Sequence, residues 1–220
     1  MKIENTEVYG FRAAIRGMRN PLDSWDKSDS RYTTRVYDDL FYWCDSNANA
    51  EGFVLGEADK TLSQKLTQAG SEHCKHLRLI QVWVDLTLPR FIHQEFDTYR
   101  HVEKISCSTM HTLMKNPITE EVFEGGFLHM SADTIHNLNE LIQLYKSTNN
   151  PQEKKQCKYQ AKRILPESFL QKRTINTNYQ CLLNIYKQRK NHELPQWREI
   201  CDWILELPYF KELTGIGEEK

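Results

Sequence analysis

The chain has 220 residues, of which 39% are hydrophobic and 11% aromatic, so it is long enough to form one large domain with a substantial core. Its 29 basic and 30 acidic residues leave a formal net charge of −1, which argues against a general coat for nucleic acid or for an anionic membrane. No segment reaches the roughly 20 consecutive apolar residues of a membrane-spanning helix, and the polar start does not resemble a secretory signal. We therefore expect a cytoplasmic protein that binds neither membrane nor nucleic acid.

The cysteines predict neither a disulfide framework nor a metal site. Six of them are scattered along the chain without a CxxC pair, namely Cys44, Cys74, Cys107, Cys157, Cys181 and Cys201. We expect reduced thiols, most of them buried. The best cluster of potential ligands is His73-Cys74-x-His76, but a second pair at zinc-like spacing is missing. We therefore expect no structural metal.

The first third of the chain predicts a short helix, a loop and one or two strands. The helix runs from residue 8 to 18, with an apolar stripe of Val8, Phe11, Ile15 and Met18. Beside this stripe lie Arg12, Arg16 and Arg19, which we interpret as a solvated face. Residues 23–37 have no clear period and suit an ordered loop, and the short apolar runs at 40–43 and 53–55 favour strands.

The middle of the chain predicts a helix, a strand and a second helix. The first helix runs from about residue 58 to 77 with the stripe Leu62, Leu66, Ala69, His73 and Leu77, and Gly70 is its weak point. This stripe places His73 in the core as a hydrogen-bonded histidine. From Ile80 to Leu86 apolar and polar residues alternate, which indicates a half-buried strand, and Pro89 ends it. A helix follows over residues 90–99.

The last part of the chain predicts four helices after an irregular segment at 117–130. The first includes residues 135–145, and the second begins at Asn150 as N-cap with Pro151 in its first turn and reaches Ile164. A long helix is predicted from Ile175 to about residue 191, and the last one runs from Pro195 to about residue 207. Without an internal repeat or flexible linker, we expect a single α+β domain.

Common nucleotide, hydrolase and zinc motifs are absent, so a functional site has to be sought elsewhere. On the predicted helix after Ile175, Asn178 and Arg189 are eleven residues apart and nearly eclipsed, whereas Asn184 is turned by about 120°. The planar fork of Arg189 suits a phosphate or a pyrimidine carbonyl, and the amides suit the edge of a heterocycle. The alternative is that these side chains are solvated or cap the helix.

A longer pattern in the same region resembles a known family. Leu165-Pro166 is followed by Asn178-x-x-x-Leu182-x-Asn184-x-x-x-x-Arg189 and then by Gln196-Trp197. This pattern resembles the carboxyl-terminal signature of the flavin-dependent thymidylate synthases. Further segments are similar to that family, namely Glu72-His73, Arg90, His93-Gln94 and Ser106-x-Ser108-Thr109. The opening Ala13 to Pro21 and the segment Ser106 to His111 resemble a divergent, often phage-associated branch.

The resemblance implies a fold, a set of ligands and a set of site residues. The implied fold is one α+β domain, residues 1–220, with a small, mostly antiparallel sheet packed by long helices. Implied contacts to the cofactor FAD come from Glu72, His73, Arg100, His101, Asn178 and Asn184. Implied contacts to the substrate dUMP come from Gln94, Ser106, Ser108, Lys162 and Arg189. The resemblance also implies a homotetramer with sites at subunit interfaces.

The implied reaction is the reductive methylation of dUMP to dTMP. In it, reduced flavin, recharged by NADPH, carries a one-carbon unit from methylenetetrahydrofolate to C5 of dUMP without a protein nucleophile. The chain departs from the family pattern at three arginines: the triplet Arg-His-Arg appears as Arg100-His101-Val102, the Arg two residues past the first Asn is Gln180, and the Arg before Leu-Pro is Lys162. Neither Gln nor Lys has the bidentate fork of Arg. Two alternatives therefore stay open: a non-catalytic flavin- or nucleotide-binding relative, and an enzyme that modifies C5 of a related uridine nucleotide.

Overall fold

The computed structural model describes residues 1–32, 52–128 and 130–217. The chain forms two compact units. Unit 1 consists of Met1–Ile3, Leu86–Thr98 and Ile105–Thr174, and unit 2 consists of Glu4–Asp85, Tyr99–Lys104 and Ile175–Lys220. Within the described ranges, no helix is long and apolar enough to cross a membrane. The strand predicted at 40–43 lies outside these ranges.

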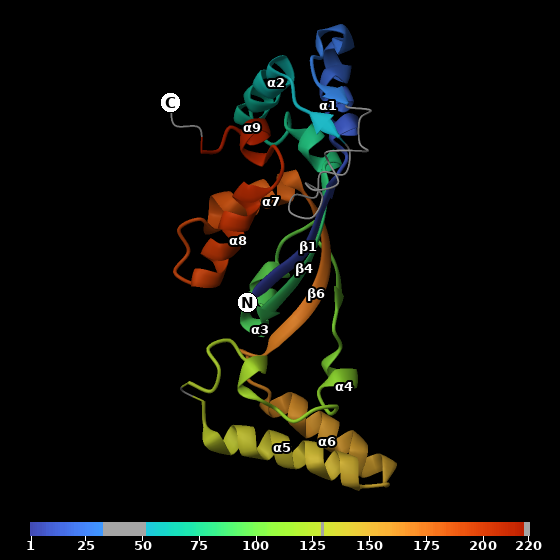
Figure 1. Ribbon diagram of the computed structural model, residues 1–220, viewed down its shortest axis with the longest axis vertical. Coiled ribbons are helices and arrows are strands. Elements are labelled where there is room, and N and C mark those ends of the chain that lie inside the picture. The colour runs from blue at the N-terminus through green and yellow to red at the C-terminus, as the bar shows by residue number, and fades with distance from the viewer. Residues whose placement is uncertain (33–51, 129, 218–220) are drawn as a thin grey trace. The chain divides into compact units, whose positions relative to one another are not determined.

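The strands form two sheets. The larger sheet is antiparallel (Figure 1), with the order β1 (Lys2–Tyr9), β4 (Gln81–Pro89), β6 (Leu170–Asn178) and β5 (Glu103–Ser106). The smaller sheet pairs β2 (Arg31–Tyr32) with β3 (Phe53–Val54) in antiparallel register, with Arg31 opposite Val54. The prediction of an α+β fold with a small antiparallel sheet and helices is confirmed.

Helices make up most of the remaining described structure. The α-helices are α1 (Phe11–Arg19), α2 (Glu57–Gln68), α3 (Arg90–Phe96), α4 (Thr109–Thr112), α5 (Ala132–Ser147), α6 (Pro151–Ile164), α7 (Tyr179–Arg189), α8 (Pro195–Glu206) and α9 (Phe210–Thr214). The short 3-10 helices are η1 (Asn20–Leu22), η2 (Trp25–Lys27), η3 (Lys75–Leu79) and η4 (Glu120–Val122). The helices predicted at residues 135–145, from Asn150 to Ile164 and from Pro195 to about residue 207 are confirmed as α5, α6 and α8.

In unit 1, α5 and α6 pack side by side as an antiparallel pair (Figure 1). The start of α6 follows from its sequence, because the Asn150 Oδ1 accepts a hydrogen bond from the backbone N–H of Gln152 at 2.9 Å. Pro151 has no backbone N–H, and the first position of a helix needs none for the helical hydrogen bonds. The core of this unit consists of Leu113, Met114, Ile118, Phe123, Leu138, Ile142, Ala161 and Leu165. The buried residues of α6 are Cys157 and Ala161, and such small side chains let two helices approach closely.

In unit 2, the core combines the buried side of β4 with aromatic side chains. Val82 and Val84 are buried while Trp83 between them is exposed, as the predicted alternation requires. Phe11 stacks on Phe53 at a centroid distance of 5.1 Å. The fully buried Tyr179 donates its hydroxyl to the carbonyl of Pro208 at 2.6 Å, which satisfies its one polar group.

Three sequence-based boundaries were wrong, each at a point where glycine or a strand interrupts an apolar stripe. Val8 belongs to β1 and not to the first helix, because Gly10 adopts φ +105° and separates β1 from α1. The helix predicted to reach residue 77 ends at Gln68, and Gly70 breaks the chain with φ +117°. Ile175 lies in β6, and α7 begins only at Tyr179.

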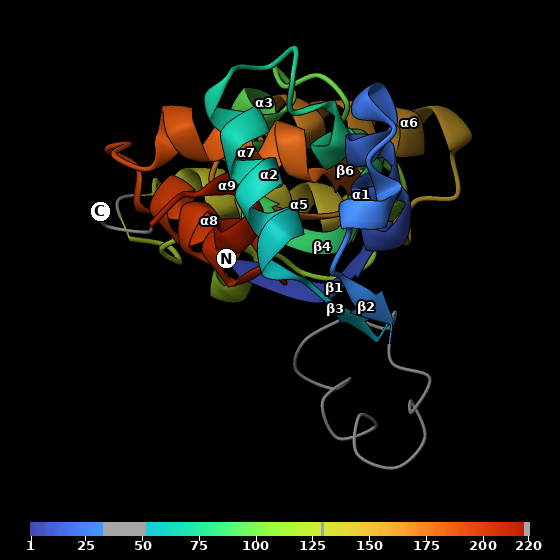
Figure 2. The ribbon, with the colours of Figure 1, turned by 90° about the horizontal axis from the view of Figure 1, so that it is seen from above.

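The break at Gly70 also reverses the prediction for the histidines. His73 is exposed in the turn before η3, so it is not the core histidine that the stripe predicted. The buried histidine of this segment is His76, whose Nε2 lies 2.8 Å from the Ser63 Oγ. Because the Ser63 hydroxyl donates to the Leu213 carbonyl at 2.6 Å, the His76 Nε2 carries the proton and donates to Ser63. Figure 2 shows α2 beside α9, the two helices that the hydrogen bond between Ser63 and Leu213 joins.

The basic stripe of α1 is not uniformly solvated. Arg12 and Arg16 are exposed as predicted, but Arg19 is buried and its Nε lies 2.7 Å from the Asp59 Oδ1 on α2. The other oxygen of Asp59 accepts hydrogen bonds from the hydroxyl of Ser28 and the N–H of Ser30. Burial acts to raise the pKa of Asp59, but these hydrogen bonds together with that of Arg19 lower it below its usual value. The pair holds α1 and α2 together.

Most of the described cysteines are free and buried, as predicted. Cys74, Cys157, Cys181 and Cys201 are buried, whereas Cys107 is exposed. Cys44 lies outside the described residues. Within the described part of the chain, no three His, Cys, Asp or Glu side chains gather closely enough to hold a metal ion.

Candidate functional site

The end of α7 holds Arg189 in an aromatic setting. The Arg189 Nε donates to the Tyr99 hydroxyl at 2.8 Å, and its guanidinium carbon lies 4.6 Å from the centre of the Trp197 ring. The Arg189 Nη1 also lies 2.9 Å from the His192 Nε2. Trp197 is fully buried, and Arg189 is half-buried. Arg189 is therefore a positioned cation and not the solvated helix arginine of the alternative interpretation.

Residues around the beginning of α7 form hydrogen bonds with the backbone of Arg100 and His101. The Asn178 Oδ1 caps α7 by accepting from the N–H of Cys181 at 3.0 Å. The Cys181 thiol in turn donates to the Arg100 carbonyl at 3.2 Å, and the Thr177 hydroxyl donates to the His101 carbonyl at 3.1 Å. The Arg100 and His101 side chains are exposed beside this anchored backbone. Asn178 therefore has a helix-capping role, as one of the sequence alternatives proposed.

The opposite face of α7 carries Asn184. This residue is exposed, and it shares its helix face with Gln180 and Lys187, four residues before it and three after it. The 3-10 helix η3 packs against α7, and the turn before η3 exposes both Glu72 and His73. All six residues predicted to bind the cofactor thus belong to unit 2.

Four of the five residues predicted to bind substrate belong to unit 1. Gln94 on α3 donates to the Glu167 carboxylate at 2.9 Å, and the same carboxylate lies 3.2 Å from the Arg90 guanidinium. Ser106 ends β5, Ser108 precedes α4, and Lys162 lies on α6; all three are exposed. Arg189, the fifth, belongs to unit 2.

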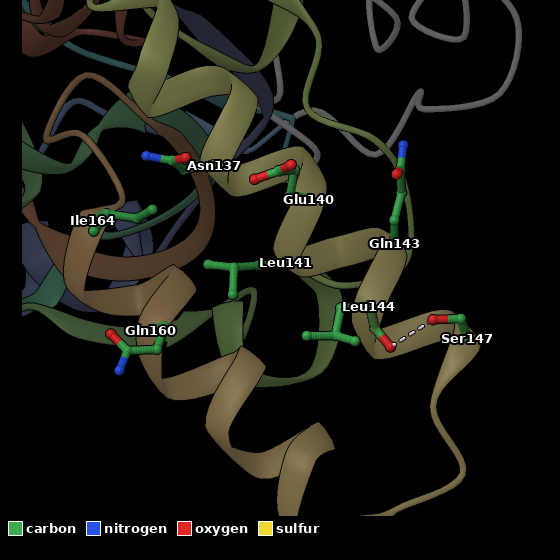
Figure 3. A pocket seen from close by; sticks show the side chains of 8 residues that line it. All are labelled: Asn137, Glu140, Leu141, Gln143, Leu144, Ser147, Gln160 and Ile164. Carbon is green, nitrogen blue, oxygen red and sulfur yellow. Dashed lines mark hydrogen bonds between the residues drawn. The ribbon is translucent and has the colours of Figure 1, made fainter.

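Two cavities lie apart from most of these residues. A groove of about 810 Å³ between α5 and α6 is lined by Asn137, Glu140, Leu141, Gln143, Leu144, Ser147, Gln160 and Ile164 (Figure 3). It contains none of the predicted site residues. A second cavity of about 490 Å³ lies at the end of α7 and is lined by Lys187, Gln188, Lys190, Asn191, His192, Glu193 and Leu194. The second cavity contains His192, the partner of Arg189.

Comparisons with known proteins identify the fold. No model of a protein family matches the chain, and no curated protein matches it. Among solved structures, thymidylate synthase X from Helicobacter pylori, crystallised with FAD and dUMP, is 18% identical with a TM-score of 0.67 over 96% of each chain. A structure of the flavin-dependent thymidylate synthase from the same organism, complexed with FAD and dUMP, is 17% identical with a TM-score of 0.63 over 96% of each chain.

The chain has the fold of the flavin-dependent thymidylate synthases. A fold of this kind fixes where the elements lie, but the function has to be argued from the site residues. Sequence reasoning missed the contacts of Arg189 with Tyr99, His192 and Trp197. Only Trp197 had a signal, because it follows Gln196 in the pattern that carried the resemblance.

Proposed function

We propose that the chain is a flavin-dependent thymidylate synthase-like enzyme that methylates dUMP at C5, with methylenetetrahydrofolate as the one-carbon donor and NADPH as the reductant. The observation that carries this proposal is the fold likeness over 96% of both chains to proteins crystallised with FAD and dUMP. The positioned Arg189 and the exposed Asn184 on α7 support it, because the resemblance assigns them to dUMP and FAD.

The donor chemistry of unit 2 fits a flavin nucleotide. The exposed amide of Asn184 suits a heterocycle edge, and the exposed cations Arg100, Arg78 and Lys187 suit phosphate groups. When bound, FAD would supply the redox chemistry and carry the one-carbon unit. The side chains of the protein would bind and orient the cofactor and the pyrimidine.

Arg189 is the residue that we assign to dUMP. Its contacts with Tyr99 and Trp197 restrict the guanidinium to one plane before any ligand arrives, so less conformational freedom is lost on binding. A planar fork in this state suits two oxygens of a phosphate or a pyrimidine carbonyl. Stabilising negative charge on the pyrimidine is the electrostatic contribution expected of a cation at this position.

We further propose a cytoplasmic homotetramer in which neighbouring subunits complete each site. Gln94, Ser106, Ser108 and Lys162 are exposed in unit 1 and are therefore accessible to a ligand or to another subunit. Light scattering on the purified protein would test the tetramer, and a monomer at micromolar concentration would contradict it.

The alternative is a non-catalytic relative that still binds flavin or nucleotide. It is favoured by Gln180 and Lys162, which replace arginines of the family pattern and lack the bidentate fork. In that case binding would persist but turnover would be absent.

Flavin binding and tritium release together distinguish the two proposals. We expect the purified protein to be yellow or to bind FAD on titration, and to release tritium from C5-labelled dUMP when NADPH and methylenetetrahydrofolate are supplied. Flavin binding without tritium release would support the non-catalytic relative. A folded protein, by circular dichroism, that binds no flavin would refute the enzyme. Release from labelled UMP but not from dUMP would indicate a related uridine nucleotide as the substrate.

A further inference from the structure

The face of α7 that is turned away from Arg189 carries a polar arrangement of its own. Gln180 and Lys187 are seven residues apart and lie on one side of the helix, whereas Arg189 is turned by about 180° from Gln180. The 3-10 helix η3 packs against α7, and it supplies Arg78. These residues all belong to unit 2.

Gln180 holds Arg78 in a fixed position. The buried Gln180 side chain accepts from the Arg78 Nε through its Oε1 and donates from its Nε2 to the Ser71 carbonyl at 3.5 Å. The Arg78 side chain is exposed, and within the described residues its two outer amino groups make no hydrogen bond or ion pair. The Arg78 Nε–H is therefore hydrogen-bonded, whereas the Nη1 and Nη2 groups have no acceptor among the described residues.

A second cation, Lys187, lies on the same face of α7, about two turns from Gln180. Burial raises the pKa of the Cys74 thiol, and the positive charges of Lys187 and Arg78 oppose that effect. The negative charge of Glu72 acts in the opposite direction, so the surroundings of Cys74 contain two cations and one carboxylate. Lys187 is exposed and, in the described part of the chain, has no acidic partner. Two exposed cations on one face of unit 2 favour the binding of an anion.

We propose that Arg78 and Lys187 form a binding site for a phosphate group of the nucleotide cofactor, with Gln180 as the residue that positions Arg78. This inference rests on the proposed function for the identity of the ligand, a diphosphate-bearing flavin nucleotide. The family pattern has an arginine at position 180, whereas here the amide oxygen of Gln180 accepts a hydrogen bond from the guanidinium of Arg78. The guanidinium therefore comes from η3 and not from α7.

The test compares flavins that differ in their phosphates. Titration of the protein with FAD and with riboflavin, followed by flavin fluorescence, is carried out on the wild type, Arg78→Gln, Arg78→Lys and Lys187→Gln. We expect Arg78→Gln to weaken FAD binding about 10- to 100-fold, Lys187→Gln about 3- to 10-fold, and Arg78→Lys to retain part of the affinity. Riboflavin affinity should stay the same because riboflavin has no phosphate. Arg16→Gln, an exposed arginine on α1, is the matched control and should change neither affinity.

A titration with inorganic pyrophosphate keeps this inference separate from the proposed function. If the wild type binds FAD but Arg78→Gln and Lys187→Gln bind it equally well, the phosphate site is refuted and the enzyme proposal stands. If the wild type binds no flavin, calorimetry with pyrophosphate decides: binding that Arg78→Gln weakens would support the site, and equal or no binding would overturn it. Lys187→Gln removes no described hydrogen bond, so it remains informative if Arg78→Gln does not fold.

Discussion

Replacing Arg189 tests the substrate assignment most directly. Arg189→Ala removes the hydrogen bonds to Tyr99 and His192 and the stacking on Trp197. A hydrogen bond to a charged group contributes about 1.5 to 3 kcal/mol, so the loss of one bidentate ligand contact should weaken dUMP binding by that amount, or about 10- to 150-fold. Arg189→Lys should recover only part of this, because lysine keeps the charge but loses the planar fork.

The same substitution also affects stability, and this effect has to be measured separately. The cation–aromatic contact contributes about 0.5 to 2 kcal/mol, and the Tyr99 hydroxyl and the His192 ring can turn to water when their partner is removed. We therefore expect Arg189→Ala to lower the free energy of unfolding in urea by about 1 to 2 kcal/mol. Arg12→Ala is a matched control, because the Arg12 guanidinium carbon lies 5.3 Å from the centre of the Tyr32 ring. It should leave dUMP affinity unchanged.

Calorimetric titration with dUMP at constant ionic strength separates the two effects, with flavin retention recorded for each variant. Equal dUMP affinity in the wild type, Arg189→Ala and Arg189→Lys, with the fold intact, would show that Arg189 serves stability alone. The assignment of Arg189 to the substrate would then be withdrawn.

Two further predictions concern buried ionisable groups in unit 2. Burial lowers the pKa of His76 from its usual 6.5 to about 4, so between these pH values the unfolded chain binds more protons than the folded chain. The free energy of unfolding should therefore be highest above about pH 6.5 and should fall by about 3 kcal/mol as the pH is lowered to about 4. Urea unfolding at several pH values would show this slope in the wild type and a shallower one in His76→Gln, and identical slopes would contradict it. Asp59→Asn should lower the free energy of unfolding by about 3 to 5 kcal/mol because it leaves Arg19 buried without a counter-charge. The double variant Arg19→Met/Asp59→Leu should lose much less, and equal losses would mean that the charge left behind is not the cause.

The elements that could be predicted from sequence are those with a strong local signal. The alternation in β4 reveals a half-buried strand, and Asn150-Pro151 fixes the start of α6 because cap and first turn are adjacent in sequence. Such signals do not depend on which distant segment packs against the element. Their confirmation therefore says little about the site, which depends on distant segments.

The boundary between β6 and α7 shows why periodicity alone failed. Residues four apart lie on one face of a helix and also on one face of a strand, so Ile175 and Tyr179 fit either structure. In the fold, Ile175 faces the core from β6, and Asn178 then caps α7. The cap residue was the better signal for the start of this helix, because a side chain that accepts from the third N–H marks a helix start.

The site shows the same division between local and distant information. Spacing along one helix placed Arg189 opposite Asn184, and this holds in the structure because it depends on α7 alone. The partner Tyr99 is 90 residues away in sequence, and Arg78 is 102 residues away from Gln180, so neither pairing has a signal in a single sequence.

This limit matters most for the interpretation of Gln180. From the sequence, a glutamine in place of arginine indicates the loss of a cation and favours a non-catalytic relative. In the fold, the Gln180 amide binds a guanidinium that comes from η3, so a cation is present at this position after all. The substitution therefore does not by itself argue for lost cofactor binding. Lys162, for which the described contacts show no comparable replacement, is then the departure from the family pattern that bears most on whether turnover survives.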